Sequence, residues 1–407
     1  MSMGLSRRLV LAGAAALPVA PAGGRRAVAQ VPTLRIGVLT DLSGPYQDVV
    51  GPFCIAGAQQ AAQDFGAAVK VEIVSADHQN KADVASGIVR QWFDRDGADV
   101  VADGGSSAVA LAVSGVAAEK NKVLLASGGA TSDLTGSKCN ANTIHWAYDT
   151  YMLARSTGGA MVKAGGDSWF FITANYSFGQ ALQRDVTGFV QAAGGRVIGA
   201  VSTPFPGTTD FSSFLLQAQA SGARVIGLAN AGTDTTNCIK QAREFGITQK
   251  LGGLLVFISD VHSLGLEVAQ GLVLSESFYW DLNDRTRAFA ERMKPRTPGK
   301  RPGMAHAGVY SSVLHYLKAA QAMGPAKTKA DGAAAVATMK AMPTDDDCFG
   351  AGVVRADGRK THPSYLFEVK KPSESRAPYD YYKLLATTPA NEAFRPLSDN
   401  VCALVKA

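Results

Sequence analysis

Short apolar runs alternate with longer amphipathic segments along most of this chain, and this alternation is the feature that most restricts its fold. Residues 34–39 form a run typical of a buried strand, whereas residues 81–94 carry Val84, Ile88 and Val89 at helical spacing. Strands separated by helices of this length form βαβ units, in which helices cover both faces of a parallel sheet. We therefore predict an α/β fold, with further strands at residues 69–74, 98–102 and 123–126.

The same alternation restarts at residue 168, with strands expected at residues 168–172, 196–201 and 224–228. A chain of 407 residues is also too long for one ordinary core, so we predict two Rossmann-like lobes with parallel central sheets. Residues 350–369 are expected to form an antiparallel hairpin. The chain should cross between the lobes near residues 147, 276 and 350, and such a three-stranded hinge favours hinge bending. The predicted N-terminal lobe comprises residues 30–147 and 276–349, the C-terminal lobe residues 148–275 and 350–385, and a C-terminal tail residues 386–407.

The first 29 residues have the features of an export signal. Arg7 and Arg8 precede an apolar run over residues 9–22, and Ala27-Val28-Ala29 provides small residues for cleavage before Gln30. The paired arginines are typical of a twin-arginine signal, although a Sec signal with two arginines would look almost the same. Because Pro18 and Pro21 interrupt the apolar run, it is too short to span a membrane. We expect a soluble protein in the periplasm, with residues 1–29 removed as a signal peptide.

The net charge of the chain argues against a nucleic-acid partner. The formal charge is +6, but four arginines lie in the first 29 residues, which contain no acid. Without them, 36 basic residues face 34 acidic ones, and no basic tract remains. Electrostatics therefore gives no reason to expect nucleic-acid binding.

Cysteines and histidines are scattered, which argues against a metal site. No two of the five cysteines have CxxC spacing, and no histidine cluster accompanies them. In an oxidising compartment we expect one disulfide and at least one free thiol. The sequence leaves the pairing open, although Cys139 and Cys402 both lie in polar, loop-like surroundings. The remaining cysteines are Cys54, Cys238 and Cys348.

Enzyme motifs are also absent from the sequence. There is no GxGxxG after a predicted strand, no Walker A loop, no GxSxG and no HExxH. Tyr148 and Asp149 lie at the first predicted crossing, where they are expected to fix the hinge. We therefore predict a protein that is not an enzyme and that carries neither a cofactor nor a metal.

Two hydroxyl-bearing segments follow neighbouring predicted strands. Ser106 and Ser107 lie between the end of one strand and the start of a helix, and Ala130 and Thr131 have the equivalent place after the next strand. Helix N-terminal amides and hydroxyls at this edge of a parallel sheet can bind a carboxylate. The alternative is that Ser106, Ser107 and Thr131 only cap helices.

Several short motifs, in order and at matching spacing, resemble one protein family. Residues 36–46 (IGVLTDLSGPY) are similar to the opening of type I periplasmic binding proteins, in the branch of the leucine/isoleucine/valine-binding proteins. The resemblance runs from about residue 33 to residue 370 and implies the substrate-binding subunit of an ABC transporter. The other matching motifs are residues 105–107 (GSS), 127–131 (SGGAT), 176–179 (YSFG), 210–212 (DFS) and 241–246 (QAREFG).

The resemblance also implies a ligand site between the lobes. Ser106, Ser107, Ala130 and Thr131 would hold the carboxylate of the ligand, while Tyr46 would help to enclose its apolar part. In the second lobe, Tyr176 and Phe178 would complete this enclosure, with Phe178 at a position where relatives carry a tyrosine. The alternative is that one of these two belongs to the core.

One departure from the family concerns the ligand's amino group. The acid that binds this group in amino-acid binders should fall near residues 256–257, which are apolar here. Asp260 and Asp234 are the nearest acids, and Asn230 begins a loop that is smaller and more polar than in relatives. Because a buried ammonium group without a carboxylate partner is costly, the departure argues against an α-amino acid.

The expected function is capture of a small carboxylate-bearing solute, either an amino acid or an aromatic or aliphatic acid. The expected partners are the permease and ATPase subunits of an ABC importer, and the protein is expected to be a monomer. A sensory receptor domain of the same fold is the alternative class, and an amide or urea-type solute is the alternative ligand. A hydrolase would need a nucleophile that the sequence does not reveal.

Overall fold

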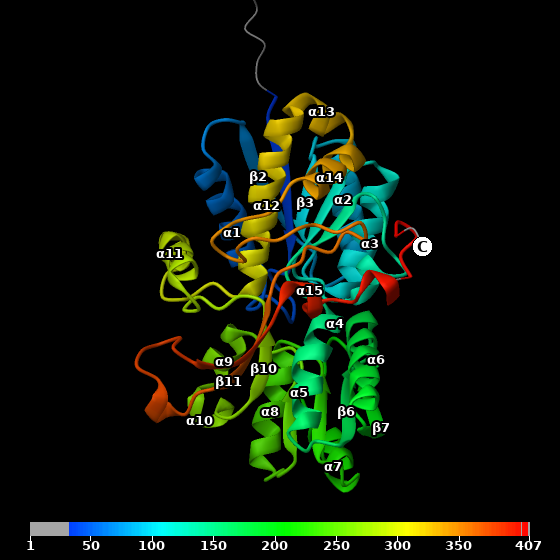
Figure 1. Ribbon diagram of the computed structural model, residues 1–407, viewed down its shortest axis with the longest axis vertical. Coiled ribbons are helices and arrows are strands. Elements are labelled where there is room, and N and C mark those ends of the chain that lie inside the picture. The colour runs from blue at the N-terminus through cyan, green and yellow to red at the C-terminus, as the bar shows by residue number, and fades with distance from the viewer. Residues whose placement is uncertain (1–31, 400, 406–407) are drawn as a thin grey trace, which may run out of the picture. The chain divides into compact units, whose positions relative to one another are not determined.

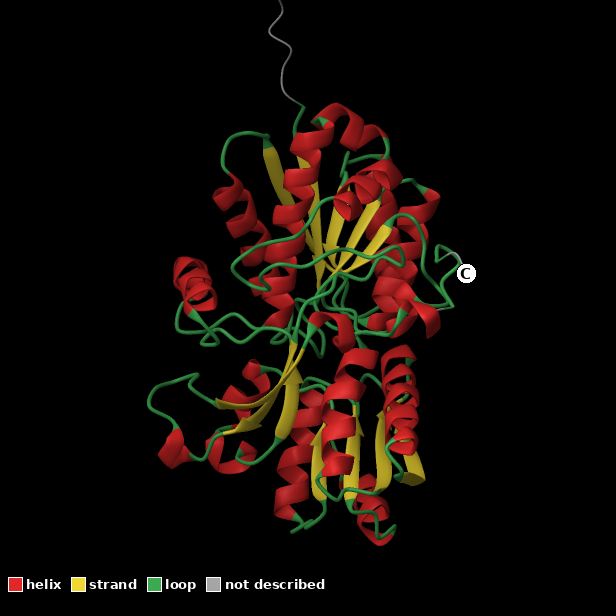
Figure 2. Cartoon of the chain, viewed as in Figure 1, coloured by secondary structure: helices red, strands yellow, loops and turns green. Residues whose placement is uncertain are grey.

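The computed structural model describes residues 32–399 and 401–405, and these residues belong to one unit. The predicted signal peptide, residues 1–29, lies outside the described residues. The first part of this unit contains a parallel sheet of five strands in the order β2-β1-β3-β4-β5 (Figures 1 and 2). Its strands are β1 (Leu34–Thr40), β2 (Val71–Asp77), β3 (Val100–Asp103), β4 (Val123–Ala126) and β5 (Thr143–His145).

Alternate residues of these strands pack into two different cores, because successive side chains of a strand point to opposite faces. Val100 packs in a cluster with Val309 and Val313, whereas Val101 packs in a cluster with Val109 and Val113. Helices therefore cover both faces of the sheet, as βαβ units require. The helices that accompany this sheet are α1 (Gly51–Phe65), α2 (Ala82–Asp94), α3 (Ser107–Glu119), α11 (Asp284–Met293), α12 (Met304–Met323), α13 (Pro325–Ala330) and α14 (Gly332–Ala341).

The second sheet has seven strands in the order β12-β11-β10-β9-β8-β6-β7. Strands β6 to β10 are parallel, and β11 and β12 are antiparallel additions at one edge. The strands are β6 (Ser168–Ala174), β7 (Arg196–Thr203), β8 (Val225–Ala229), β9 (Lys250–Gly253), β10 (Val273–Glu276), β11 (Ser364–Val369) and β12 (Tyr382–Thr388). The helices of this lobe are α4 (Thr150–Leu153), α5 (Gly159–Lys163), α6 (Ser177–Ala192), α7 (Ser212–Ala220), α8 (Thr233–Glu244), α9 (Ile258–Leu264) and α10 (Leu266–Ala269), with a π-helical turn at Ala154–Gly158. The predicted α/β fold with two lobes and mainly parallel central sheets is confirmed.

The predicted hairpin within residues 350–369 forms only in part: Val354 bridges Lys360 in antiparallel fashion across the Asp357-Gly358 turn, but β11 does not pair with residues 350–354. Gly352 and Val354 make only isolated bridges, to Thr344 and Lys360, and β11 pairs instead with β12. Strand β12 could not be predicted from the sequence, because this edge strand is largely exposed and shows no alternation of apolar and polar residues. Since β12 ends at Thr388, the second sheet also extends past residue 385, where the lobe was expected to end.

Three segments connect the two sheets. The first follows β5 and the second follows β10, close to the predicted positions 147 and 276. The third lies later than residue 350, because Arg359 still bridges His145 of β5 and β11 begins only at Ser364. After β12 the C-terminal segment, with α15 (Ala390–Ala393), returns to the first lobe and adds a further connection (Figure 1).

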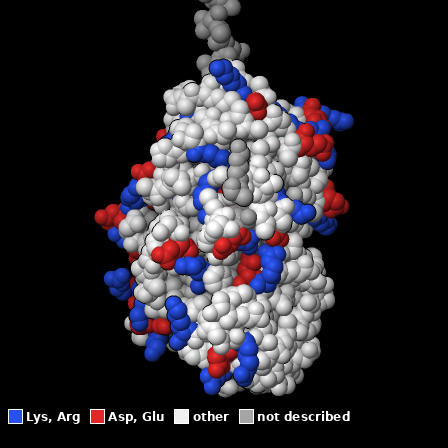
Figure 3. Space-filling model, turned by 45° about the vertical axis from the view of Figure 1, so that its right-hand side comes forward, with Lys and Arg blue, Asp and Glu red and all other residues white. Residues whose placement is uncertain are grey.

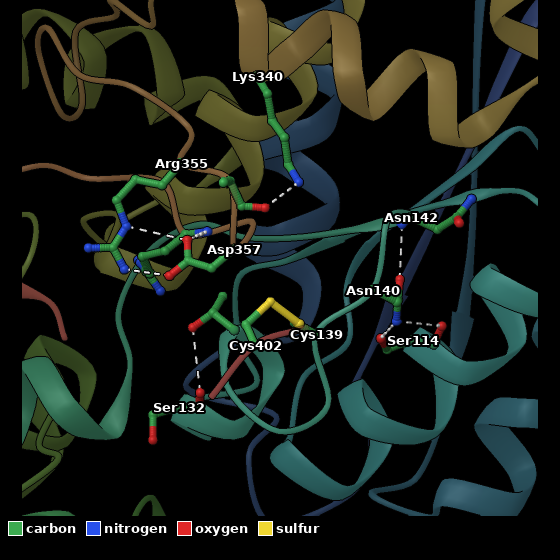
Figure 4. Close-up of a disulfide and its surroundings, with 12 residues drawn as sticks. Ser114, Ser132, Cys139, Asn140, Asn142, Lys340, Arg355, Asp357 and Cys402 are labelled. Carbon is green, nitrogen blue, oxygen red and sulfur yellow. Dashed lines mark hydrogen bonds and ion pairs between the residues drawn. A yellow bond between two sulfur atoms is a disulfide. The ribbon is translucent and has the colours of Figure 1, made fainter. Parts of the chain in front are cut away.

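A disulfide attaches this C-terminal segment to the first lobe. Cys139, which precedes β5, is bonded to Cys402, with 5.6 Å between their Cα atoms (Figure 4). Cys54, Cys238 and Cys348 are buried free thiols. The expectation of one disulfide therefore holds within the described residues, and the structure identifies its two cysteines.

The described surface agrees with the charge balance of the sequence. Figure 3 shows basic and acidic side chains intermingled over the upper and left parts of the face in view, whereas its lower right part carries few of either sign. No described helix combines the length and the apolar character that a membrane crossing requires.

Candidate functional site

A cavity lies where the carboxyl ends of both sheets' parallel strands meet, and segments from both lobes line it. In the first sheet β1 stands between β2 and β3, and in the second β6 stands between β7 and β8, so the chain connections reverse direction at these strands. Such switch points are where α/β sheets bind ligands. The lining residues are Tyr46, Val49, Val50, Gly105, Ser106, Ser107, Gly128, Ala130, Tyr148, Tyr176, Phe178, Ala231, Leu255 and Phe257.

The first lobe supplies hydrogen-bond donors to this cavity. Ser106 is buried at the N-cap of α3, and its Oγ has no hydrogen-bond partner among the described residues. The Oγ of Ser107 accepts the amides of Ala130 at 3.2 Å and Thr131 at 3.1 Å, so its hydroxyl hydrogen is free to be donated. No side chain of the described residues caps the first turn of α3, whose amides carry the positive end of the helix dipole. This side of the cavity, formed by Ser106, Ser107 and the first turn of α3, is therefore suited to a hydrogen-bond acceptor of the ligand, above all an anionic group. We call it the carboxylate pole.

The second lobe supplies an apolar and aromatic wall. Tyr176 precedes α6, and its ring stacks on Phe205 with 4.3 Å between ring centroids and 11° between planes. Its hydroxyl is 2.5 Å from that of Tyr46, which comes from the first lobe, so this contact joins the two lobes. Burial raises the pKa of both phenols, which therefore stay neutral at physiological pH.

Phe178 and Ala130, two of the residues predicted to contact the ligand, also line the cavity. Phe178 is only 2% exposed and belongs to the hydrophobic core as well, so both interpretations of this residue apply. Six predicted site residues therefore come together around the cavity: Tyr46, Ser106, Ser107, Ala130, Tyr176 and Phe178.

Thr131 lies beside the cavity rather than on its wall. Its Oγ1 accepts the amide of Asp133 at 3.3 Å and so caps the 3₁₀ turn Ser132–Thr135. Its own amide is bonded to Ser107. This geometry favours the capping alternative for Thr131 over a contact with the ligand.

Three polar residues of the second lobe do not line the cavity. Asn230 is hydrogen-bonded to Thr235 at 2.6 Å, and Asp260 accepts the amide of Phe257 at 2.9 Å in the first turn of α9. Asp234 is buried in the first turn of α8, and its Oδ2 has no described partner. Burial raises the pKa of Asp234 and of Asp260 to about 7. Asn230 is held by the side chains of Thr235 and Cys238, and Asp260 by the backbone amide of Phe257, so both side chains make local contacts and neither lines the cavity.

Sequence reasoning missed most of the small and apolar lining residues. Gly105, Gly128 and Ala231 each lie two residues after the end of a parallel strand. Their position at the carboxyl end of a strand is the sequence signal that could have identified them. Leu255 and Phe257 follow β9, a short strand that ends in two glycines. Tyr148, expected only to fix the hinge, lines the cavity and donates a hydrogen bond to the Gly128 carbonyl at 2.9 Å.

The cavity has two properties that restrict its ligand. Of the described residues that line it, none is Asp, Glu, Lys, Arg or His. Only about 20 Å³ is open to the centre of a water molecule, which is room for about one water. A ligand larger than about one water therefore does not fit in the cavity as the lobes lie in this structure.

Comparison with known proteins shows what this chain is similar to. Residues 33–375 match the family described as periplasmic binding protein. A periplasmic binding protein of known structure from Burkholderia mallei is 48% identical, with a TM-score of 0.88 over 92% of this chain and 99% of the other. No curated protein matches the chain.

Two further solved structures extend this comparison. A branched-chain amino acid ABC transporter periplasmic ligand-binding protein from Burkholderia xenovorans LB400 is 39% identical, with a TM-score of 0.80 over 92% of this chain and 100% of the other. An amino acid ABC transporter substrate-binding protein from Pseudomonas fluorescens Pf-5 is 23% identical, with a TM-score of 0.81 over 92% of this chain and 99% of the other. With its two lobes of mainly parallel sheet, this chain belongs to the periplasmic binding protein family, as a substrate-binding protein of the ABC transporter type with the type I fold.

Proposed function

We propose that this protein captures a small carboxylic acid with an aromatic or branched aliphatic body in the periplasm, and delivers it to an ABC permease. One observation carries this proposal: the cavity has a pole of free donors at Ser106 and Ser107 and an apolar wall opposite. A carboxylate satisfies the donors, because it accepts hydrogen bonds from hydroxyls and helix N-terminal amides. The apolar body of the ligand is then buried against the second lobe.

The lining also favours a carboxylic acid over an α-amino acid. An amino acid would bring a protonated ammonium group into a cavity whose described lining holds no acidic side chain. Removing an ammonium group from water without a carboxylate partner costs several kcal/mol or more. The relative from Burkholderia xenovorans is described as a branched-chain amino acid transporter protein, so leucine is the competitor to test.

Closure of the lobes around the ligand is the second part of the proposal. The Tyr46–Tyr176 contact joins the two lobes at the cavity, and the three segments between the sheets and the C-terminal segment connect the lobes elsewhere. Hinge motions of this kind occur on microsecond-to-millisecond timescales. Because the lobes are in contact in this structure, we expect the free protein to populate a more open arrangement as well, from which the ligand is taken up. Small-angle scattering should then show a smaller radius of gyration with saturating ligand than without it.

A thermal-shift screen tests the ligand class directly. Benzoate and isovalerate should raise the melting temperature, since a ligand at 100 times its Kd stabilises the native state by about 2.7 kcal/mol. Leucine, phenylalanine and benzamide should raise it much less. If leucine stabilises the protein and both acids do not, the proposed class is wrong; stabilisation by benzamide alone would indicate an amide binder.

A pair of serine variants connects this screen to the cavity. Ser106→Ala should weaken binding of benzoate about tenfold or more, because a hydrogen bond to a charged group contributes about 1.5–3 kcal/mol. Ser86→Ala removes a hydroxyl on α2 that bonds only the Ala82 carbonyl, and serves as the control with wild-type affinity. Equal affinity of both variants would contradict the proposed carboxylate pole.

Delivery to a permease and location in the periplasm need their own measurements. N-terminal sequencing of the native protein should begin near Gln30, whereas a start at Met1 or Ser2 would contradict export with cleavage. Stimulation of a reconstituted permease and ATPase by the loaded protein should distinguish transport from the sensory alternative, for which loaded protein would leave ATP hydrolysis unchanged. Incubation with ligand should yield no product, which tests the expectation that the protein is not an enzyme.

A further inference from the structure

Asp103 combines three energetically costly features at one residue. It ends β3 with a φ of +81°, in the left-handed region that residues other than glycine seldom adopt. Its side chain is fully buried, and both carboxyl oxygens lack a hydrogen-bond partner of normal geometry among the described residues. Costly features of this kind persist mainly where function requires them.

The carboxyl group of Asp103 lies directly beneath the floor of the cavity. A Cβ atom placed on Gly128 would be 2.6 Å from Asp103 Oδ1, 2.9 Å from Gly105 Cα and 2.9 Å from Val50 Cγ1. Gly105, Gly128 and Val50 all line the cavity. Ser106 and Ser107 follow within four residues of Asp103, so the carboxyl group lies next to the donors proposed to hold the ligand.

The groups around Asp103 come from four segments of the chain, and none of them is a cation at neutral pH. Thr40 and Asp41 lie at the end of β1, Cys54 lies on α1, and Tyr148 lies in the connection after β5. The ring of His78, at the end of β2, lies against Gly105, and burial lowers the pKa of this histidine, so it is neutral. A carboxylate at this place is therefore not neutralised by a basic partner among these groups.

We propose that Asp103 is protonated when the cavity takes up an anionic ligand, so that the protein captures a carboxylate together with one proton from solvent. This inference rests on the proposed function, because it concerns a carboxylate held at Ser106 and Ser107. An ionised Asp103 under the floor would repel such a ligand, and protonation removes that repulsion. Asp103 thus determines which net charge the site accepts.

The electrostatics of the free protein allows this proton to be gained near neutral pH. Burial raises the pKa of Asp103 to about 7, partly offset by Thr40, Cys54 and the Gly105 amide. A bound carboxylate raises this pKa further. Affinity should therefore be constant below about pH 6, and should fall by up to about tenfold per pH unit above pH 7.

Calorimetric titration with benzoate in buffers of different ionisation enthalpy measures the number of protons taken up. The wild-type protein should take up close to no proton at pH 5.5 and between about half and one proton at pH 8. Asp103→Asn should abolish both the uptake and the dependence of affinity on pH. Asparagine tolerates the left-handed region and has nearly the same shape as aspartate, so this variant should fold.

Asp149→Asn is the matched control, because Asp149 is also fully buried with a raised pKa. Its carboxyl group caps α4 and faces Arg359 instead of the cavity floor, so the variant should keep the wild-type proton uptake. Benzoate binding without proton uptake at pH 8 would overturn the proposal for Asp103 and leave the proposed function intact. Absence of carboxylate binding at every pH would overturn both. Proton release on leucine binding would overturn the proposal as well, because an ammonium group would then pair with ionised Asp103.

Discussion

The two halves of the candidate site differ in polarity, although they come from similar βα loops. The first lobe presents serine hydroxyls, glycines and the N-terminus of α3 beside the apolar or aromatic side chains of Tyr46, Val49, Val50 and Ala130. The second lobe presents only apolar and aromatic side chains: Tyr176, Phe178, Ala231, Leu255 and Phe257. This difference indicates that the two lobes bind different parts of the ligand: the first lobe binds its carboxylate head group, and the second lobe covers its apolar body. Hydrogen bonds of fixed direction select the head, while apolar packing depends on the area buried.

The buried acids of the second lobe should make the folding stability depend on pH, whereas Asp103 of the first lobe should make the affinity for the ligand depend on pH. The pH dependence of stability is the largest effect that we expect. Asp234 and Asp260 of the second lobe have pKa values of about 7 in the folded protein, against 3.8 for a free aspartate. The folded state therefore binds more protons than the unfolded state between about pH 4 and pH 7. Stability is highest near the lower end of this window and falls, on the order of a few kcal/mol, as pH rises through it.

Melting curves of the double variant Asp234→Asn/Asp260→Asn, compared with wild type between pH 5 and pH 8, test this effect. The variant should lose less stability with rising pH than the wild type, while its affinity for benzoate keeps the same pH dependence. A parallel pH profile of stability in both proteins would contradict the assignment of these two acids.

Ser107→Ala should produce the largest loss of affinity in the first lobe. The substitution removes one donor to the ligand and also the acceptor for the amides of Ala130 and Thr131. Binding should weaken about 100-fold, by the same factor for acetate, isovalerate and benzoate, because all three share the head group. Titration of the three acids measures the factor; a loss that grows with ligand size would break the proposed division between the lobes.

Phe178→Leu should show the opposite pattern in the second lobe. The side chain lines the cavity and belongs to the core, so a smaller apolar residue reduces contact with the ligand body. Affinity for benzoate should fall about tenfold while that for acetate stays nearly unchanged, with a stability cost of about 1 kcal/mol. The same titrations measure this effect, and an equal loss for both acids would show that Phe178 acts on the head group.

Thr131→Ala should have the smallest effect on binding. Because Thr131 caps a 3₁₀ turn through the Asp133 amide, its loss should lower the stability of the free protein by about 1 kcal/mol. Affinity for benzoate should stay within about threefold of the wild type. A tenfold loss of affinity with unchanged melting temperature would instead place Thr131 among the ligand contacts.

The sequence predicted the main strands of both lobes because buried parallel strands are short apolar runs between amphipathic helices. It failed at β12, whose exposed edge position removes the apolar pattern, and at the third connection, which lies after Arg359. For the site, hydroxyls and aromatics after strand ends predicted six lining residues. Asn230, Asp234 and Asp260 were expected to join them and do not.

The sequence by itself determined the α/β class, the repetition of the lobe and the chemistry available at each strand end, because these depend on local periodicity and residue type. Only the tertiary structure decided which side chains share the cavity, since Tyr46 and Tyr176 are 130 residues apart and meet only when the lobes are packed. It also decided that Cys139 pairs with Cys402 and that the Asp103 carboxyl group lies under a floor of glycines. Contacts at such separations depend on how sheets and helices pack in three dimensions, which no local pattern of residues records.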